Sequence, residues 1–308
     1  MNTSQKPVIK MNGFINFLKP PGISSHQGII FFRKLLKVKK VGHAGTLDPG
    51  AAGVLPVCLG KGTKASSYLM DTRKKYRAEI YLGVTTDTLD SWGKIVKELP
   101  LDGIYSRDII NVVENFKGKI TQVPPMYSAI KKKGKPLYQV ARRGDTVERE
   151  PREVFIYSLN IIYIDLPRVL LEVECSKGTY IRTLAADIGE SLGVGASLSF
   201  LLRTKSGPFE INEGFTREEI EECYQAGRIQ NLILPVDIAF LHLSQAVIKE
   251  EARKALMNGV SLDTASLQKY EISDKIVRIY SPAREFLALG RWQGHPPHLK
   301  LRPVKLFV

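Results

Sequence analysis

The sequence predicts an α+β fold with a mixed, mainly antiparallel sheet and a small β-rich C-terminal unit. Segments with helix and strand patterns are intermixed, without the strict βαβ alternation of a parallel sheet. The length of 308 residues suggests two domains, or one large domain with an appendage. After Pro235, short strand-like segments follow one another. We therefore expect a larger domain over residues 1–240 and a small one over 241–308.

Strands of the larger domain are predicted where apolar residues alternate with polar ones or form short runs. Tyr76, Ala78 and Ile80 alternate with Arg77 and Glu79, which is the period of a half-buried strand. The strand-like segments are, in order, 13–18, 76–82, 155–164, 169–175 and 198–202.

Helices of the larger domain are predicted where apolar residues recur at helical spacing behind a capping residue. Ser24 or Ser25 precedes one such segment, Ser106 another and Thr179 a third, whereas 85–93 is typical of a polar loop. The helical segments are 26–36, 61–70, 106–116 and 180–192. In the C-terminal unit we expect a helix over 245–258 and strands over 276–280, 286–289 and 305–308.

The chain is strongly basic, with 45 Lys and Arg against 31 Asp and Glu and a net charge of +14. The cations gather in three clusters, at 33–40, 61–77 and 131–152, and Tyr127 and Tyr138 accompany the third. Any one cluster could be a solvated face. Three clusters flanking the same motifs favour a phosphate-binding surface, and interleaved aromatic rings suit an RNA loop with unstacked bases.

Several classes of protein are excluded. No apolar run approaches the roughly 20 residues of a membrane span, and the N-terminus has no signal-peptide pattern. The chain has an odd number of cysteines, namely Cys58, Cys175 and Cys223, and none of them forms a CxxC pair. We therefore expect no disulfide framework and a cytoplasmic location. Patterns for P-loop, dinucleotide, serine-hydrolase and metal sites are missing from the sequence, which predicts no cofactor and no metal.

The densest motif runs from Val41 to Gly50 and contains His43 and Asp48. The proline after Asp48 holds the aspartate in an extended conformation, and Pro49-Gly50 then supplies a turn. The aspartate of such a turn could equally serve only as a capping group, and His43 as a structural hydrogen-bonding residue. Both readings stay open on pattern alone.

A second motif, from Ser176 to Leu184, places Arg182 in the first turn of the predicted helix. A cation at that position opposes the helix dipole, so its presence would be explained by a carboxylate partner across the fold. A solvent-facing arginine is the alternative.

Five separated segments together resemble the TruB-type tRNA pseudouridine synthases. They are KPPGISSH from Lys19, VGHAGTLDPGAAGVLPVCLGKGTK from Val41, KYRA from Lys75, QVPPMYSAIKKKGKPLYQVARRG from Gln122 and KGTYIRTLAADIGE from Lys177. They occur in the family's order and near its spacing. Ser24 stands where threonine is more frequent, and the C-terminal part resembles a small PUA-like RNA-binding domain.

The resemblance implies a cofactor-independent isomerase that converts one T-loop uridine of tRNA, at position 55, to pseudouridine. It implies that Asp48 is the essential aspartate and that Arg182 pairs with it and keeps it ionised. It also implies that Tyr76 stacks on the target base and is a candidate for the proton-transfer step. Because the uridine must leave its stack to be reached, base flipping belongs to the cycle.

The resemblance also assigns residues that bind the substrate. His43 would hold the flipped-out loop, Tyr180 and Leu201 would shape the pocket, and Lys19 and Pro20 would pack beside it. A basic insertion over about 124–152 would grip the RNA. The residues of the insertion expected to bind RNA are Lys131, Lys132, Lys133, Arg142 and Arg143.

The implied partner is the T-arm of tRNA, bound by a monomer without a membrane or a protein partner. Two alternatives stay open: an RNA-binding protein without catalysis, and a related synthase that acts on another RNA or within a guided particle. The presence of Asp48, Tyr76 and Arg182 together counts against the first.

Overall fold

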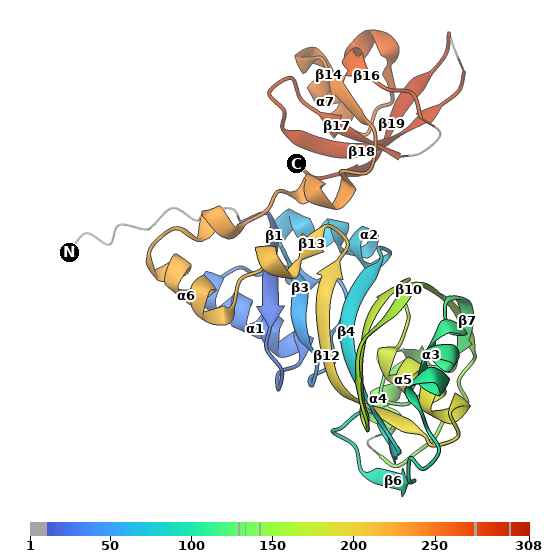
Figure 1. The fold of residues 1–308 in the computed structure, drawn as a ribbon. Coiled ribbons are helices and arrows are strands. Elements are labelled where there is room, and N and C mark those ends of the chain that lie inside the picture. The colour runs from blue at the N-terminus through green and yellow to red at the C-terminus, as the bar shows by residue number, and fades with distance from the viewer. Residues whose placement is uncertain (1–10, 129, 133, 142, 274–275, 296) are drawn as a thin grey trace, which may run out of the picture.

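The computed structural model describes residues 11–128, 130–132, 134–141, 143–273, 276–295 and 297–308. The described residues form two large sheets, a nine-stranded one from the first 210 residues and a six-stranded one from the C-terminal part, joined by short helical turns (Figure 1). The predicted α+β class with mainly antiparallel pairing and a β-rich C-terminal region is confirmed.

The nine-stranded sheet has the order β1-β3-β12-β4-β11-β10-β7, with β2 paired to β3 and β13 to β12. Only β3 and β12 pair in parallel. Its strands are β1 (Gly13–Lys19), β2 (Val41–His43), β3 (Ala52–Leu59), β4 (Lys74–Leu82), β7 (Gly118–Gln122), β10 (Arg152–Asp165), β11 (Arg168–Cys175), β12 (Ala196–Ser206) and β13 (Phe209–Glu210). This order places β4 and β12 side by side at the centre.

Strand β3 was not predicted, because glycine and proline interrupt its sequence. Gly53 has a φ of +101°, and a Cβ there would lie 2.3 Å from the carbonyl oxygen of Arg203. The glycine therefore permits the close parallel approach of β3 and β12, which the pattern of apolar residues does not reveal.

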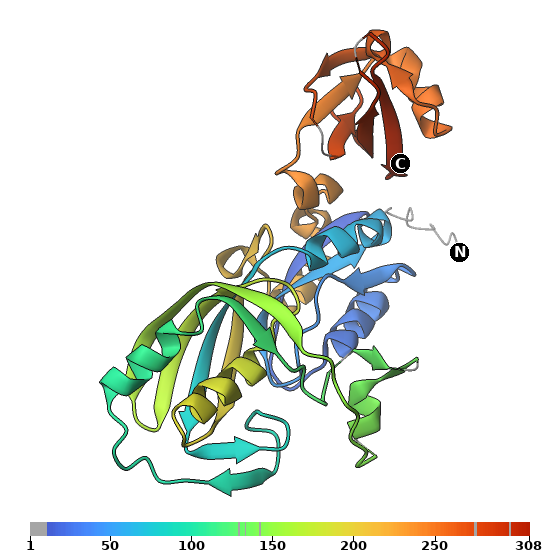
Figure 2. The ribbon, with the colours of Figure 1, turned by 90° about the vertical axis from the view of Figure 1, so that its right-hand side faces the viewer.

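Two helices cover one face of the sheet and lie side by side (Figure 2). They are α3 (Ser106–Glu114), which packs on β10, and α5 (Ile181–Ser191), which packs on β12 and β4. Their buried faces include Ile109 and Val113 of α3 and Leu184 and Ile188 of α5. The remaining helices are α1 (Ser25–Leu36), α2 (Ser66–Met70), α4 (Leu137–Ala141), α6 (Arg217–Gln225) and α7 (Arg253–Met257). The predicted helix over 61–70 is instead a 3-10 turn over Gly60–Ala65 followed by α2.

The capping predictions have mixed outcomes. Ser24 caps α1, since its Oγ accepts the Gln27 N–H at 3.1 Å and the Gln27 amide oxygen accepts the Ser24 N–H at 2.7 Å. For α3 the prediction of Ser106 was wrong: Tyr105 is the cap. For α5 the prediction of Thr179 was wrong too, because its hydroxyl donates to Ser176 O at 3.0 Å and the following tyrosine is the cap.

The C-terminal sheet has the order β15-β19-β18-β17-β14-β16. The predicted helix over 245–258 is wrong in its first part, where Ala246, Val247 and Ile248 are buried in a strand between two others. The predicted strand over 305–308 begins earlier, at Lys300. The strands are β14 (Gln245–Ile248), β15 (Leu262–Asp263), β16 (Leu267–Tyr270), β17 (Ile276–Tyr280), β18 (Phe286–Gln293) and β19 (Lys300–Leu306).

The two sheets meet through an aromatic cluster around Phe240. Its ring lies 5.0 Å from that of Tyr68 in α2 and 5.6 Å from that of Phe307 at the C-terminus. The ammonium group of Lys64 also donates to Leu306 O at 2.9 Å. Among the described residues, no helix is both long enough and apolar enough to cross a membrane.

Candidate active site

An ion pair between Asp48 and Arg182 lies at the centre of the candidate site. Asp48 follows β2 in the turn that leads to β3, and Arg182 is the second residue of α5. Arg182 Nη2 lies 2.9 Å from Asp48 Oδ2. The arginine side chain is only 5% exposed, whereas 41% of the aspartate side chain is accessible. Arg182 therefore has a carboxylate partner across the fold, and that carboxylate can be reached from outside.

The Arg182 guanidinium also joins two further segments to this pair. Nη1 donates to Thr88 O at 3.0 Å and lies 3.6 Å from Asp90 Oδ2, and Nη2 donates to Tyr127 O at 2.8 Å. A buried arginine needs such a set of acceptors, because an unpaired buried charge is strongly destabilising. The loop before β6 (Ile95–Glu98) and the start of the basic insertion thus converge on the Asp48 turn.

The electrostatic environment of Asp48 contains opposing effects. Burial raises the pKa of the carboxyl group, and the neighbouring Asp90 acts in the same direction. The Arg182 guanidinium lowers that pKa, as Lys19 does to a smaller extent. The charged form of Asp48 therefore depends on its arginine partner.

Lys19 ties the end of β1 to the same turn. Its side chain is buried, and Nζ donates to Pro20 O at 2.7 Å, Ile23 O at 2.8 Å and Pro49 O at 3.3 Å. Burial lowers the pKa of Lys19 to about 8, while Asp48 opposes that shift. Pro20 itself is exposed. Lys19 thus fixes the backbone of the turn that contains Asp48.

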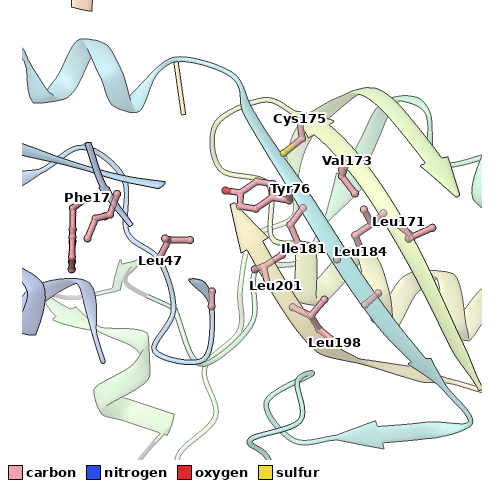
Figure 3. Close-up of a cluster of buried hydrophobic side chains, with 14 of the residues drawn as sticks. Phe17, Leu47, Tyr76, Leu171, Val173, Cys175, Ile181, Leu184, Leu198 and Leu201 are labelled. Atoms are coloured by element: carbon pink, nitrogen blue, oxygen red, sulfur yellow. The ribbon is translucent and has the colours of Figure 1, made fainter. Parts of the chain in front are cut away.

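Tyr76 comes from β4 and lies among apolar side chains. Figure 3 shows it next to Ile181 and Leu201, with its hydroxyl pointing out of the cluster toward the side of Leu47. Burial raises the pKa of Tyr76 to about 12, so the phenol is neutral near pH 7. Leu201, from β12, is buried in the same cluster. The structure therefore brings Tyr76 and Leu201 together on the apolar side of the site.

Arg203 is a buried cation that the sequence analysis missed. From β12, its Nε donates to Val54 O at 2.7 Å, and its Nη2 and Nη1 donate to Gly45 O at 3.0 Å and Thr46 O at 3.3 Å. Its positive charge also opposes the effect of burial, which raises the pKa of Tyr76. Arginine within the apolar strand pattern was the available signal, since arginine is seldom fully buried unless it is paired. Arg203 supports the backbone that precedes Asp48.

His43 ends β2 within the same segment. Burial lowers its pKa, and the positive charge of Arg203 lowers it further, so the imidazole favours its neutral form. Its Nδ1 is buried without a hydrogen-bond partner in the structure. Nearby, the Ser25 hydroxyl donates to Leu47 O at 2.9 Å and accepts the Leu47 N–H at 2.8 Å. This exchange holds the residue before Asp48 against α1.

Tyr180 caps α5 and is locked to the strand before the basic insertion. Its N–H donates to Gln122 Oε1 at 3.0 Å, and Gln122 Nε2 donates to Tyr180 O at 3.2 Å. Burial raises the pKa of the Tyr180 hydroxyl. The insertion therefore starts from a rigid base beside the site.

The insertion projects from the body as a short hairpin and a helix (light green in Figure 2). Lys131 and Lys132 form β8 (Lys131–Lys132), which pairs with β9 (Lys135–Pro136), and α4 follows. Arg143 is exposed after that helix. Lys133 and Arg142 lie outside the described residues. The insertion also reaches the site, because Tyr127 O near its start accepts a hydrogen bond from Arg182.

The part of the chain that the structure describes contains no candidate metal site. No group of three or more His, Cys, Asp or Glu side chains is placed there to hold an ion. The chemistry that the site itself offers is that of a carboxylate at an accessible surface, a buried guanidinium and a neutral phenol.

Two family descriptions match consecutive parts of the chain. The N-terminal domain of TruB family pseudouridylate synthases matches residues 33–181, and the C-terminal domain of tRNA pseudouridylate synthase B matches residues 182–241. The tRNA pseudouridine synthase B of Caldanaerobacter subterraneus is 43% identical over 300 residues, which cover 97% of this chain and all of that one. That of Alkaliphilus oremlandii is 49% identical over 249 residues, 81% of this chain and 82% of that one.

Solved structures of similar architecture include multi-protein and RNA-bound assemblies. A chain of a Cbf5-Nop10-Gar1 complex superposes with a TM-score of 0.76 at 30% identity, covering all of this chain and 91% of that one. A chain of an H/ACA RNP bound to a substrate RNA containing 2'-deoxyuridine superposes with a TM-score of 0.75 at 28% identity, covering 98% and 86%. Both superpositions extend over the C-terminal sheet as well.

Proposed function

The chain belongs to the TruB family of pseudouridine synthases and is a tRNA-modifying isomerase, and from this premise we propose that it converts uridine 55 of the T-loop with Asp48 as the catalytic carboxylate. The observation that carries the assignment is the Asp48–Arg182 ion pair at 2.9 Å, with an accessible carboxylate and a buried guanidinium. Asp48 is an acidic side chain that is both paired with Arg182 and accessible to a substrate from the surface.

Isomerisation breaks the bond from ribose C1′ to uracil N1, rotates the base and joins C1′ to C5. The proton leaves C5, and N1 ends protonated, so the reaction involves no oxidant or reductant. A carboxylate supports it either as a nucleophile or by stabilising charge as the first bond breaks. Either role needs Asp48 in its charged form, which Arg182 favours.

Tyr76 stacks on the flipped uracil in this proposal, and Leu201 and Tyr180 shape the walls of the pocket. Because the phenol of Tyr76 has a pKa of about 12, it keeps its proton near neutral pH and presents an uncharged ring to the base. His43, whose pKa is lowered, meets the RNA as a neutral hydrogen-bonding group. Base flipping brings the uridine from its stack to these residues.

The basic insertion and the C-terminal domain bind the T-arm in this proposal. The insertion over about 124–152 contributes cations, and we assign residues 1–240 to catalysis and 241–308 to a PUA-like RNA-binding domain. We propose that a single chain acts without a protein partner. The proposed tRNA substrate also supports a cytoplasmic location.

The test is to map pseudouridine in unmodified tRNA after incubation with the purified chain. We expect modification at position 55 alone, and none in a tRNA whose position 55 is cytidine. Modification at other positions only, or none at all, would contradict the proposal.

A second candidate is a synthase that works inside a guided particle, which the similarity to chains from RNP complexes favours. The same incubation separates the two. Turnover of free tRNA by the isolated chain contradicts the guided alternative, whereas turnover only after addition of a guide RNA and partner proteins supports it.

A further inference from the structure

Trp92 is a large aromatic side chain that the proposed mechanism does not use. It lies between β5 (Val84–Thr86) and β6 (Ile95–Glu98), and 70% of it is exposed. Its indole nevertheless touches the catalytic turn, because a Cβ added at Gly50 would lie 2.3 Å from Trp92 Nε1. The edge of the ring therefore packs against the residue two places after Asp48, while most of the ring meets solvent.

The loop that carries Trp92 is held by specific hydrogen bonds. The Trp92 N–H donates to Asp90 Oδ1 at 3.1 Å, and the Thr88 hydroxyl donates to the same oxygen at 2.6 Å. The Ser91 N–H donates to Leu198 O at 2.9 Å, which attaches the loop to the central strand β12. Trp92 is thus presented from a fixed backbone.

The same aspartate connects Trp92 to the ion pair. Asp90 Oδ2 lies 3.6 Å from Arg182 Nη1, so one carboxylate contacts both the catalytic guanidinium and, through its other oxygen, the backbone of Trp92. The indole therefore lies against the turn that carries Asp48.

An exposed tryptophan adds little to the stability of the fold, because most of its apolar surface stays in water. A fixed aromatic face beside a site for a flipped nucleotide suits a nucleobase that has lost its own stacking partner. The net charge of +14 favours a polyanion over an apolar protein partner as the occupant.

We propose that Trp92 stacks on an unpaired nucleobase of the RNA substrate, next to the uridine that enters the site. The inference rests on the proposed function. Trp92 is then a substrate-binding residue that acts on affinity, and its removal weakens binding without slowing the chemical step.

The first test compares Trp92→Ala and Trp92→Phe with Val96→Ala, an exposed residue of the same hairpin. We expect Trp92→Ala to weaken tRNA binding about tenfold, within the range of stacking on one base. Trp92→Phe should bind within about threefold of the parent, because phenylalanine keeps a ring. Single-turnover rates at saturating tRNA should be equal for all three.

The second test uses fluorescence, since the chain has two tryptophans and Trp292 is buried in the C-terminal sheet. In Asp48→Asn, which holds substrate unconverted, saturating tRNA should quench an emission component that Asp48→Asn/Trp92→Phe lacks. The difference between these two proteins isolates Trp92 without altering Trp292.

Equal binding by Trp92→Ala and Val96→Ala, or the same quenching with and without Trp92, would overturn the inference while leaving the proposed function intact. A slower single-turnover rate with unchanged affinity would also overturn it. By contrast, absence of pseudouridine formation by the parent protein would contradict the proposed function itself.

Discussion

Two groups of cations differ in their surroundings: one group is buried around Asp48, and the other is exposed at the surface. The difference indicates that the first group positions catalytic residues and the second binds RNA. Arg182, Arg203 and Lys19 are buried, and each donates to backbone carbonyls of the segments around Asp48. Lys39, Lys40 and many others in the basic clusters are exposed. Buried cations determine where the carboxylate lies, whereas exposed ones add attraction to phosphates.

The largest effect on the fold should follow Arg203→Met. Three carbonyls, those of Gly45, Thr46 and Val54, lose their donor. An unsatisfied buried acceptor such as Val54 O costs about 1–3 kcal/mol, and the two partly buried bonds add smaller costs, so we expect the free energy of unfolding to fall by roughly 3 kcal/mol. Denaturant unfolding measures this, with activity lost in parallel.

The control for Arg203→Met is Arg77→Met on the neighbouring strand β4, where the arginine is exposed. That variant should lie within about 0.5 kcal/mol of the parent. If the two variants were equally stable, Arg203 would not support the Asp48 segment.

Arg182→Met should change the pH dependence of the reaction. The rate falls as pH drops through the pKa of Asp48 in the folded enzyme, because catalysis needs the charged carboxylate. Burial already raises that pKa, and the guanidinium opposes the rise. Without the guanidinium the pKa moves further up, so the acidic limb of the single-turnover profile should shift to higher pH.

We expect a reduction of about 10²-fold or more in the rate at neutral pH for Arg182→Met, and a smaller one for Arg182→Lys, which keeps the charge. An acidic limb at the same pH in Arg182→Met would contradict the role of Arg182 as the group that keeps Asp48 ionised.

The smallest effect per residue is expected in the insertion. Replacing Lys131, Lys132 and Lys133 by alanine should weaken tRNA binding and reduce the slope of log K against log salt by up to about 2–3. The rate at saturating tRNA should not change. The matched variant replaces Lys117 and Lys119, which pair with Glu114 and Glu153, and should keep the slope. An unchanged slope in the triple variant would identify the stretch as a solvated face.

Much of the framework could be predicted from local pattern. The alternation at Tyr76–Leu82 predicted β4, and the cap of α1 was expected at Ser24 or Ser25. The position of Arg182, which opposes the helix dipole, indicated a carboxylate partner as one of two explanations, and the structure has that partner. In each case the sequence pattern lies within a few residues of the structural feature that it predicts.

What could not be predicted depends on distant contacts. Arg203 supports carbonyls about 150 positions away, and the close approach at Gly53 is visible only once β3 and β12 are paired. The strand Gln245–Ile248 shows no alternation of polar and apolar residues, because its consecutive residues Ala246, Val247 and Ile248 are all buried. Trp92 lay in a segment expected to be only a polar loop, and its importance comes from packing against Gly50.

The most direct measurement of the central claim is single-turnover pseudouridine formation by Asp48→Asn, with tRNA affinity and thermal unfolding measured on the same preparation. Asparagine keeps the size of the side chain and removes its charge. We expect no detectable pseudouridine, tRNA binding within about threefold of the parent and a similar midpoint of unfolding. Appreciable turnover by this folded, tRNA-binding variant would contradict the assignment of Asp48 as the catalytic carboxylate.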